Sequence, residues 1–172
     1  MPSSMPVTNW GERLLLTAIT LCVLVTVLLL MRRGWLKRSR LQKDIASPRA
    51  LPSDFEASGI FTARYVASTA AGAWLTRIVA HTLGMPARCQ LEWGQHGLAV
   101  KRDNAMPFLV LRNEIIDVRA DRAIAGRAFE RDGLVVVTWK LGDVFIDSGF
   151  RFDKADQQVE FLNLMKKQGS VK

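Results

Sequence analysis

Few residues in this chain have the types and spacing that catalysis or metal binding needs. The two histidines, His81 and His96, have no Cys, Asp or Glu at ligand spacing, so we interpret both as solvated. Asp143 and Asp147 lie four positions apart around a predicted strand and therefore share a face. Two carboxylates alone favour a solvated face over a metal or acid/base site. With no serine-nucleophile, zinc-protease or phosphate-loop motif either, the sequence predicts no enzyme, no cofactor and no metal.

A second set of titratable residues alternates in sign between positions 117 and 132. It comprises Asp117, Arg119, Asp121, Arg122, Arg127, Glu130, Arg131 and Asp132. This mixture predicts exposed charges that screen one another. Arg151 follows the last predicted strand, and we interpret it as a solvated charge in preference to an anion anchor.

Three tryptophans and one glycine complete the candidates. Trp74, Trp93 and Trp139 fall within predicted strands, where an aromatic ring suits a half-buried pleated surface. We therefore expect all three in the core, in preference to a ligand-stacking role. Gly149 lies near the end of the final strand, where a glycine indicates a bulge or a close backbone approach.

Antiparallel strands are the elements that must position these residues. Short segments rich in β-branched and aromatic residues predict strands at Gly59–Ser68, Ala73–Ala80, Cys89–Trp93, Leu98–Arg102, Pro107–Val118, Arg127–Arg131, Leu134–Lys140 and Val144–Phe150. Asp132-Gly133 and Gly142-Asp143 each predict a two-residue hairpin. Such short connections require antiparallel neighbours, so the sheet is largely a meander. The segment Ala80–Arg88, which contains Gly84 and Pro86, predicts an exposed loop.

One amphipathic helix follows the strands, predicted at 153–168. Asp153 is placed to act as its N-cap, and two lysines with a glycine behind them suit its end. Its apolar stripe is formed by Val159, Phe161, Leu162 and Met165. We expect this stripe to cover an open end or edge of the sheet. Residues 57–168 therefore predict one mainly β domain, an antiparallel barrel or sandwich capped by a C-terminal α-helix.

Eighteen consecutive residues without a charge, Leu14–Met31, come before this domain. As a helix they span about 27 Å, close to the hydrocarbon thickness of a bilayer, so we predict a transmembrane helix. Trp10 and Trp35 bracket the run as interfacial anchors. A cleaved signal peptide is disfavoured, because the positive charges follow the apolar run and no A-x-A-like site is present.

The charges around the span predict its direction. Six basic residues follow it, namely Arg32, Arg33, Lys37, Arg38, Arg40 and Lys43. The positive-inside rule places this flank in the cytoplasm, with residues 1–13 outside, a proline-broken linker at 32–56 and the β domain inside. The same charges are expected to attract anionic lipid head groups, at about 1 kcal/mol each near the surface. The chain is therefore predicted to be a single-pass protein of the cytoplasmic membrane.

Charge balance and the small residues of the span bear on possible partners. Residues 1–52 hold eight Lys/Arg against two Asp/Glu, and residues 53–172 hold sixteen against fourteen, so the net charges are +6 and +2. A nucleic-acid-binding domain would carry the excess on its folded part, so we expect no nucleic-acid partner. Ala18, Cys22 and Thr26 recur every four residues, either by chance or as a face through which two spans pair into a homodimer. Cys22 and Cys89 lie in different parts of the chain, so no internal disulfide is expected.

The stretch Val135–Gly142 (VVVTWKLG), followed by Asp147–Arg151 (DSGFR), resembles the signature of a small family of actinobacterial membrane proteins. Members of that family carry a bacterial PH-like domain with a T-W-x-L-G … T/S-G-F-R pattern. The N-terminal span, Ala125–Arg127 and the final helix also fit it. The resemblance implies a pleckstrin-homology superfold. It does not imply phosphoinositide binding, because the corresponding turn, Thr69–Gly72, has only two arginines nearby.

These features predict a non-enzymatic, membrane-anchored protein that presents a cytoplasmic PH-like domain for protein interaction or scaffolding. Two alternatives remain, a sensor of anionic lipid surfaces and an accessory subunit of a transport or export complex, a label sometimes attached to the family. The expected partners are the bilayer through residues 14–31, anionic lipid head groups and an unidentified protein.

Overall fold

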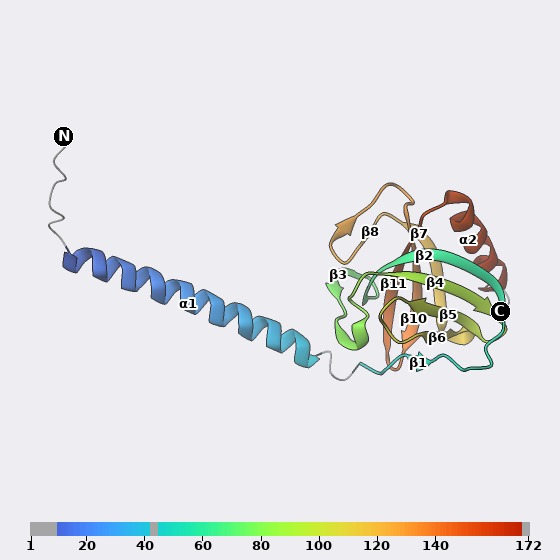
Figure 1. Cartoon of the computed structure of the whole chain (residues 1–172), viewed down its shortest axis with the longest axis horizontal. Coiled ribbons are helices and arrows are strands. Elements are labelled where there is room, and N and C mark those ends of the chain that lie inside the picture. The colour runs from blue at the N-terminus through green and yellow to red at the C-terminus, as the bar shows by residue number, and fades with distance from the viewer. Residues whose placement is uncertain (1–9, 42–44, 170–172) are drawn as a thin grey trace. The chain divides into compact units, whose positions relative to one another are not determined.

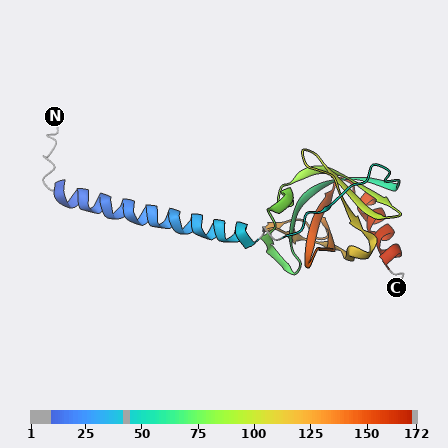
Figure 2. The same cartoon turned by 90° about the horizontal axis from the view of Figure 1, so that it is seen from below.

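The computed structural model describes residues 10–41 and 45–169, which belong to two units. Helix α1 (Trp10–Leu41) forms the first unit. The second unit holds the strands and helix α2 (Ala155–Gly169). In Figures 1 and 2, α1 is one continuous helix, and the strands of the second unit curve around a common interior with α2 beside them.

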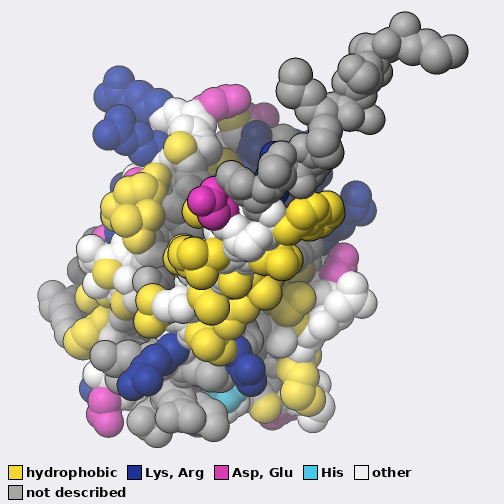
Figure 3. Space-filling model, turned by 90° about the vertical axis from the view of Figure 1, so that its left-hand side faces the viewer, with side chains coloured by type: hydrophobic (Ala, Val, Ile, Leu, Met, Phe, Trp, Pro, Cys, Tyr) yellow, Lys and Arg dark blue, Asp and Glu magenta, His cyan; other side chains and the backbone are white. Residues whose placement is uncertain are grey.

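A run of leucine, valine and isoleucine builds α1 and leaves it without a polar face. Its threonine hydroxyls donate to carbonyl oxygens one turn earlier, as Thr17 Oγ1 does to Arg13 O at 2.8 Å and Thr26 Oγ1 to Cys22 O at 2.7 Å, so they need no external partner. Over Trp10–Gly34 the helix is long and apolar enough to cross a membrane, and none of its side chains is buried. Hydrophobic side chains are the most prominent kind at the centre of Figure 3.

An antiparallel sheet that curves into a barrel forms the second unit. Its strands are β1 (Arg49–Ala50), β2 (Ala57–Ala70), β3 (Ala73–Arg77), β4 (Ala87–Gly94), β5 (Gly97–Arg102), β6 (Phe108–Leu111), β7 (Ile115–Asp121), β10 (Leu134–Leu141) and β11 (Val144–Phe152). Their order is β1-β6-β5-β4-β2-β11-β10-β7, and β3 pairs with β2. A separate ribbon consists of β8 (Ala123–Ile124) and β9 (Arg127–Ala128). The predicted antiparallel architecture is confirmed, including the β10–β11 hairpin at Gly142-Asp143.

Two features let the sheet curve back on itself. β2 is fourteen residues long and pairs with β4 through its first part and with β11 through its second, and the register shifts between Gly149 and Phe150. The extra residue, Val66, belongs to β2, so the bulge bends β2 where it faces Gly149 and Phe150. β6 then leads through a short 3-10 turn, Arg112–Glu114, directly into β7. β6, which lies next to the short β1 at one end of the strand order, is therefore followed directly along the chain by β7 at the other end.

This turn corrects one prediction. The sequence predicts a single strand over Pro107–Val118, but the structure divides it into β6 and β7. The carboxylate of Glu114 accepts the backbone N–H of Leu111 at 3.0 Å, so β6 ends in a turn held by its own side chain. Apolar residues continue on both sides of the turn, which is why the pattern alone did not reveal the break.

The β8–β9 ribbon corrects a second prediction. The sequence predicts a strand over Arg127–Arg131 that pairs across Asp132-Gly133 with the next strand. In the structure only Arg127–Ala128 is extended and it pairs with β8, while β10 pairs with β7 and β11. Gly133 N–H donates to Glu130 O at 3.0 Å and closes a local turn. Asp132-Gly133 is a dipeptide typical of hairpins, but here it forms a turn whose two flanking segments do not pair with each other.

Aromatic and β-branched side chains fill the barrel. Trp93 and Trp139 are buried, as predicted, and Trp139 stacks on Phe108 with ring centroids 5.8 Å apart. Trp74 is half exposed, so its prediction as a core residue is wrong. Its strand, β3, pairs with β2 at one edge, and among the described strands nothing pairs with its other edge.

A chain of hydrogen bonds crosses the core. The Nε1–H of Trp139 can only donate and the carbonyl of Leu83 can only accept. The bonds therefore run from Trp139 through Ser148, Ser68 and Tyr65 to Leu83, with lengths of 2.9, 2.7, 2.6 and 2.7 Å. Leu83 is itself fully buried. The prediction of an exposed loop at Ala80–Arg88 is thus wrong at its centre, which is tied to the core.

Helix α2 packs on β7 and β11 and confirms the predicted C-terminal helix. Phe161 is fully buried with its ring centroid 5.3 Å from that of Phe61, and Met165, one turn later, is buried as well. Val159, predicted in the same stripe, is exposed. Asp153, predicted as the N-cap, accepts the Nε–H of Arg64 at 3.2 Å instead, and the helix begins at Ala155.

Candidate functional site

The predicted membrane contacts belong to α1 and its flank. Ala18, Cys22 and Thr26 are exposed and succeed one another by single turns, so they lie on one side of the helix. Trp10, Arg32 and Arg33 are exposed near the ends of the apolar stretch. Trp35, Lys37, Arg38 and Arg40 belong to α1, but their side chains lie outside the described residues, as does Lys43 entirely. Their roles stay predictions.

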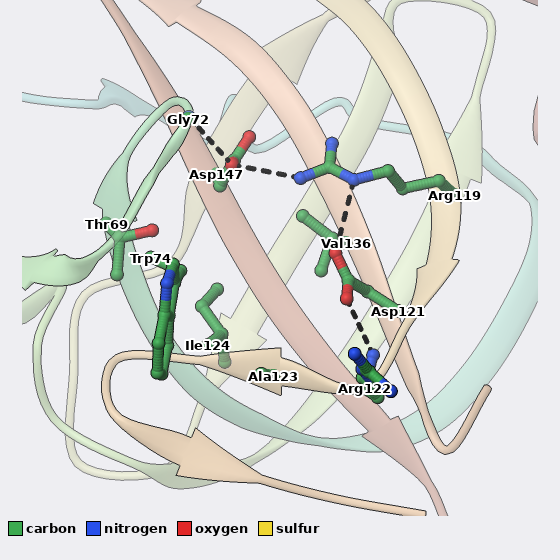
Figure 4. A pocket seen from close by; sticks show the side chains of 10 residues that line it. All are labelled: Thr69, Gly72, Trp74, Arg119, Asp121, Arg122, Ala123, Ile124, Val136 and Asp147. Carbon is green, nitrogen blue, oxygen red and sulfur yellow. Dashed lines mark hydrogen bonds and ion pairs between the residues drawn. The ribbon is translucent and has the colours of Figure 1, made fainter. Parts of the chain in front are cut away.

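A pocket of about 470 Å³ lies in the second unit, where three segments meet (Figure 4). These segments are the β2–β3 turn, the passage from β7 into β8, and the β10–β11 pair. Its lining consists of Thr69, Gly72, Trp74, Arg119, Asp121, Arg122, Ala123, Ile124, Val136 and Asp147. The volume is in the range of pockets that bind small ligands or partner side chains.

Asp147 is the centre of the polar side of this pocket. The residue is buried, and its carboxylate accepts hydrogen bonds from Arg119 Nη2 at 3.0 Å, Thr138 Oγ1 at 2.5 Å and Gly72 N–H at 3.4 Å. The strand register explains the meeting. Asp147 on β11 is opposite Thr138 on β10, and Thr138 is opposite Asp117 on β7, so Arg119 lies on the same face two positions further along.

Arg119 is held by three carboxylates. Besides Asp147 it contacts Asp117 at 3.2 Å and Asp121 at 3.4 Å, and it donates to Thr138 Oγ1 at 2.8 Å. Burial alone would lower the pKa of Arg119, but the hydrogen bonds and charges of Asp147 and Asp117 raise it above its ordinary value. The predictions that Asp147 is solvated and that Arg119 is merely screened are therefore wrong. Asp143 is exposed, as predicted.

The apolar side of the pocket is formed by Ile124 and Val136, which are both buried, with Trp74 at the margin (Figure 4). Thr69 is fully buried, and its hydroxyl has no hydrogen-bond partner in the described part of the chain. A buried polar atom without a partner costs about 1–3 kcal/mol. The pocket thus combines an aromatic margin, an apolar floor and a fixed cation.

Comparison with known proteins decides the family. The model of the family described as bacterial PH domain-like matches residues 45–166, which is well over half of the chain. The chain belongs to this family. A search of curated proteins finds no match. The bacterial PH domain-like match extends over the whole barrel and most of α2, and the pocket in Figure 4 lies within it.

The PH-like domain lines this pocket with charged, aromatic and apolar side chains. No histidine or cysteine lines it. Within residues 10–41 and 45–169, no group of three or more His, Cys, Asp or Glu is placed to hold a metal ion. His81 and His96 are exposed, and Nε2 of His81 lies 2.9 Å from Ile45 O. The guanidinium of Arg151 lies 5.7 Å from the Phe129 ring, so it stacks on an aromatic surface.

Several residues of this pocket are candidates from the sequence alone, but the contact between Arg119 and Asp147 is not predicted. Arg119 and Asp147 are 28 positions apart, and only the register of three strands brings them together. Alternation with Ile146 and Ser148 places Asp147 on the other face of its strand, where a solvated side chain is the ordinary expectation, so no local signal marks its pairing.

Proposed function

We propose that this protein is a non-enzymatic membrane protein whose PH-like domain binds a partner protein in the cytoplasm. The apolar stretch of α1 would anchor it, and an anchor raises the local concentration of the domain at the membrane without any new contact. The observation that carries the proposal is the half-exposed indole of Trp74 beside the pocket of Figure 4.

Trp74 belongs to a segment rich in exposed apolar side chains. Between β2 and β4, the side chains of Trp74, Leu75, Val79 and Met85 are each at least half exposed. Single exposed apolar residues are ordinary on protein surfaces, whereas several in one segment favour a binding surface. Tryptophan and arginine are also the residues most often found at the energetic centres of protein interfaces.

This segment is fixed to the barrel by its backbone. Ser68 N–H donates to Leu83 O at 2.7 Å, and Ile78 N–H donates to Ser68 O at 2.9 Å. The side chains of Leu83 and Ile78 are both buried. A partner that binds here would lose little free energy in ordering the loop, because the loop is already ordered.

The lining of the pocket supports a particular kind of partner. An aliphatic or aromatic side chain of the partner would pack between Trp74 and Val136. A neighbouring carboxylate would pair with Arg122, whose side chain is exposed and makes no ion pair with any described residue. The partner would therefore present an apolar anchor next to an acidic residue.

In-cell photo-crosslinking tests the proposal. We expect a photoreactive residue at Leu75 to give one discrete adduct in the full-length protein, and Trp74→Ala to reduce its yield at least tenfold. The same probe at Val159, exposed on α2, is the matched control and should give none. The adduct should form again between the purified proteins. Equal adducts at both positions, or an adduct indifferent to Trp74→Ala, would contradict the proposal.

The direction of the span is part of the proposal. The six basic residues from Arg32 to Lys43 follow the apolar stretch, which supports a cytoplasmic domain that also attracts anionic lipid head groups. A phosphatase that is active only outside the cytoplasm, fused after Lys172, should stay inactive, whereas a fluorescent protein that folds in the cytoplasm should emit there. An active phosphatase at this position would reverse the assignment.

A further inference from the structure

Three charged residues are buried in the described part of the chain, and only two have a counter-ion. Glu92 pairs with Lys101 at 2.6 Å and Asp147 pairs with Arg119 at 3.0 Å. Arg102, which is 7% exposed, is in none of the ion pairs of the described residues. A buried charge without a partner is strongly unfavourable, so Arg102 needs an explanation.

The protein groups around Arg102 satisfy it only in part. Its Nη1 donates to Thr82 O at 2.7 Å and its Nη2 to Thr82 Oγ1 at 3.1 Å, but its Nε has no partner. The guanidinium carbon lies 4.9 Å from the centroid of the Tyr65 ring and 5.2 Å from that of Phe108. Aromatic faces attract a cation but do not neutralise it.

The neighbouring titratable groups cannot supply the missing negative charge. Burial raises the pKa of Tyr65 and of Cys89 to about 12, so both are neutral at pH 7. Burial also lowers the pKa of Arg102, and Tyr65 and Cys89 offset this only in part. The guanidinium therefore remains a cation in a poorly solvated position with no anion beside it.

Arg102 lines a groove of about 550 Å³ whose walls are mostly apolar. One wall comes from the chain around β1, including Pro48 and Leu51, and the other from Met106 in the β5–β6 turn and Phe108 at the start of β6. Met106 is almost fully exposed at the rim. A hydrocarbon chain fits such walls, because apolar surface is removed from water on both sides.

The backbone at the charged end of the groove is held in an unusual conformation. His81 and Thr82, which both line the groove, have φ values of 51° and 59°. A positive φ is uncommon for any residue with a side chain and is an outlier for a β-branched one. Such conformations are unfavourable and cluster at ligand sites. At Thr82 it places both the carbonyl and the hydroxyl against Arg102.

We propose that this groove binds an anionic amphiphile, a molecule with one oxyanion head and a hydrocarbon tail. The head is the counter-ion that Arg102 lacks, and the tail lies along Leu51, Met106 and Phe108. The site is separate from the pocket beside Trp74 and does not depend on the proposed protein partner. Its recognition combines one buried cation with apolar walls, so neither a small anion nor a neutral alcohol satisfies it.

Calorimetric titration of the full chain in phosphatidylcholine nanodiscs tests this proposal, with empty nanodiscs as the reference. Octyl phosphate is the probe, while inorganic phosphate and octanol supply its head and its tail alone. We expect octyl phosphate to bind at least tenfold more tightly than either. Equal binding of octanol would show that charge is not recognised, and equal binding of inorganic phosphate that the tail is not; either result overturns the proposal, as does the absence of binding.

Two variants separate the site from the fold. Arg102→Met should weaken octyl phosphate at least tenfold while the midpoint of thermal unfolding stays level or rises, because an apolar residue replaces an unpaired charge. Met106→Asp should also weaken the binding of octyl phosphate at least tenfold, because it places a negative charge at the exposed rim of a groove that binds an anion. Met85→Asp, which is exposed outside the groove, should leave that binding unchanged. If Arg102→Met fails to fold, Met106→Asp decides. Unchanged affinity in the variant that folds overturns the proposal.

Discussion

Arg119 on β7 reaches across β10 to hold Asp147 on β11. The two ends of this pair, Nη2 and Oδ2, are 3.0 Å apart, and Thr138 on the intervening strand bonds to both residues. The three side chains therefore link three strands that are neighbours in the sheet, at the polar wall of the pocket beside Trp74. An ion pair with this degree of burial and this many hydrogen bonds is worth more than one at the surface.

Replacing the central carboxylate should destabilise the domain. Asp147→Asn leaves Arg119 without its most buried partner, and we expect the free energy of unfolding to fall by about 1–3 kcal/mol. Urea unfolding of the full chain in detergent measures it. Asp143→Asn, four positions earlier and exposed, is the matched control and should change stability by less than about 0.5 kcal/mol. Equal losses in the two variants would mean that the Asp147 network adds nothing.

Gly149 is expected to tolerate no side chain. A Cβ there would lie 2.9 Å from Ile124 Cγ2 and 3.0 Å from its Cδ1, opposite the bulge in β2. Gly149→Ala should therefore lower the free energy of unfolding by about 1–3 kcal/mol. Adding Ile124→Val, which removes the Cδ1 methyl, should restore part of that loss. The effects of substitutions on the free energy of unfolding are not additive when the two residues are in contact. Strict additivity in this cycle would rule out the proposed clash.

Alkaline pH should unfold the domain through Tyr65. Burial raises its pKa from 10.0 to about 12, so the unfolded chain ionises first as the pH rises. The stabilisation is fully present below pH 10 and is lost as the pH rises to about 12, at up to about 3 kcal/mol for two pKa units. Unfolding curves of the wild type and Tyr65→Phe between pH 9 and 12 measure it.

Tyr65→Phe should start less stable, since its hydrogen bonds to Ser68 and Leu83 are gone, but lose stability less steeply with pH. Burial also raises the pKa of Cys89 to about 12, so Cys89 contributes a loss of stability over the same interval in both proteins. Parallel curves would show that Tyr65 does not titrate in this interval.

Pairing of spans is expected along Ala18, Cys22 and Thr26. Cys22→Ile places a bulky side chain in the middle of this face and should weaken self-association several-fold, because small residues allow close helix approach. A two-hybrid assay in membranes measures it. Leu21→Ile, one position away and therefore on another side of α1, is the matched control. Loss of signal in both variants, or in neither, would remove this face as the contact.

The sequence predicted what depends on local pattern. The apolar run of α1 and the β10–β11 hairpin at Gly142-Asp143 each have a physical cause within a few residues. The β6–β7 break was missed because Glu114 ends the strand through one side-chain hydrogen bond. Trp74 was misplaced because burial of an edge strand depends on what covers it, and the sequence does not show that.

The two binding features needed long-range information. The groove is closed by Pro48 and Leu51, from a segment predicted only as a proline-broken connection, in which β1 pairs with β6. Arg102 is one basic residue among twenty-four, and nothing near it in the sequence marks it as buried. Only the folded structure, which places Thr82, Tyr65 and Phe108 around Arg102, shows that this arginine has no counter-ion among the described residues.

The hydrogen bond between Ser68 and Ser148 also bears on the order in which the chain inserts and folds during synthesis. These hydroxyls are 2.7 Å apart in space and eighty positions apart in the sequence, so β2 and β11 cannot pair until Ser148 has been synthesised. At about 5–20 residues per second, the 117 residues from Arg32 to Ser148 take about 6–23 s to translate. The apolar segment is complete throughout that interval. On the proposed topology, the helix enters the bilayer first and the barrel then folds on a chain that is already attached to it.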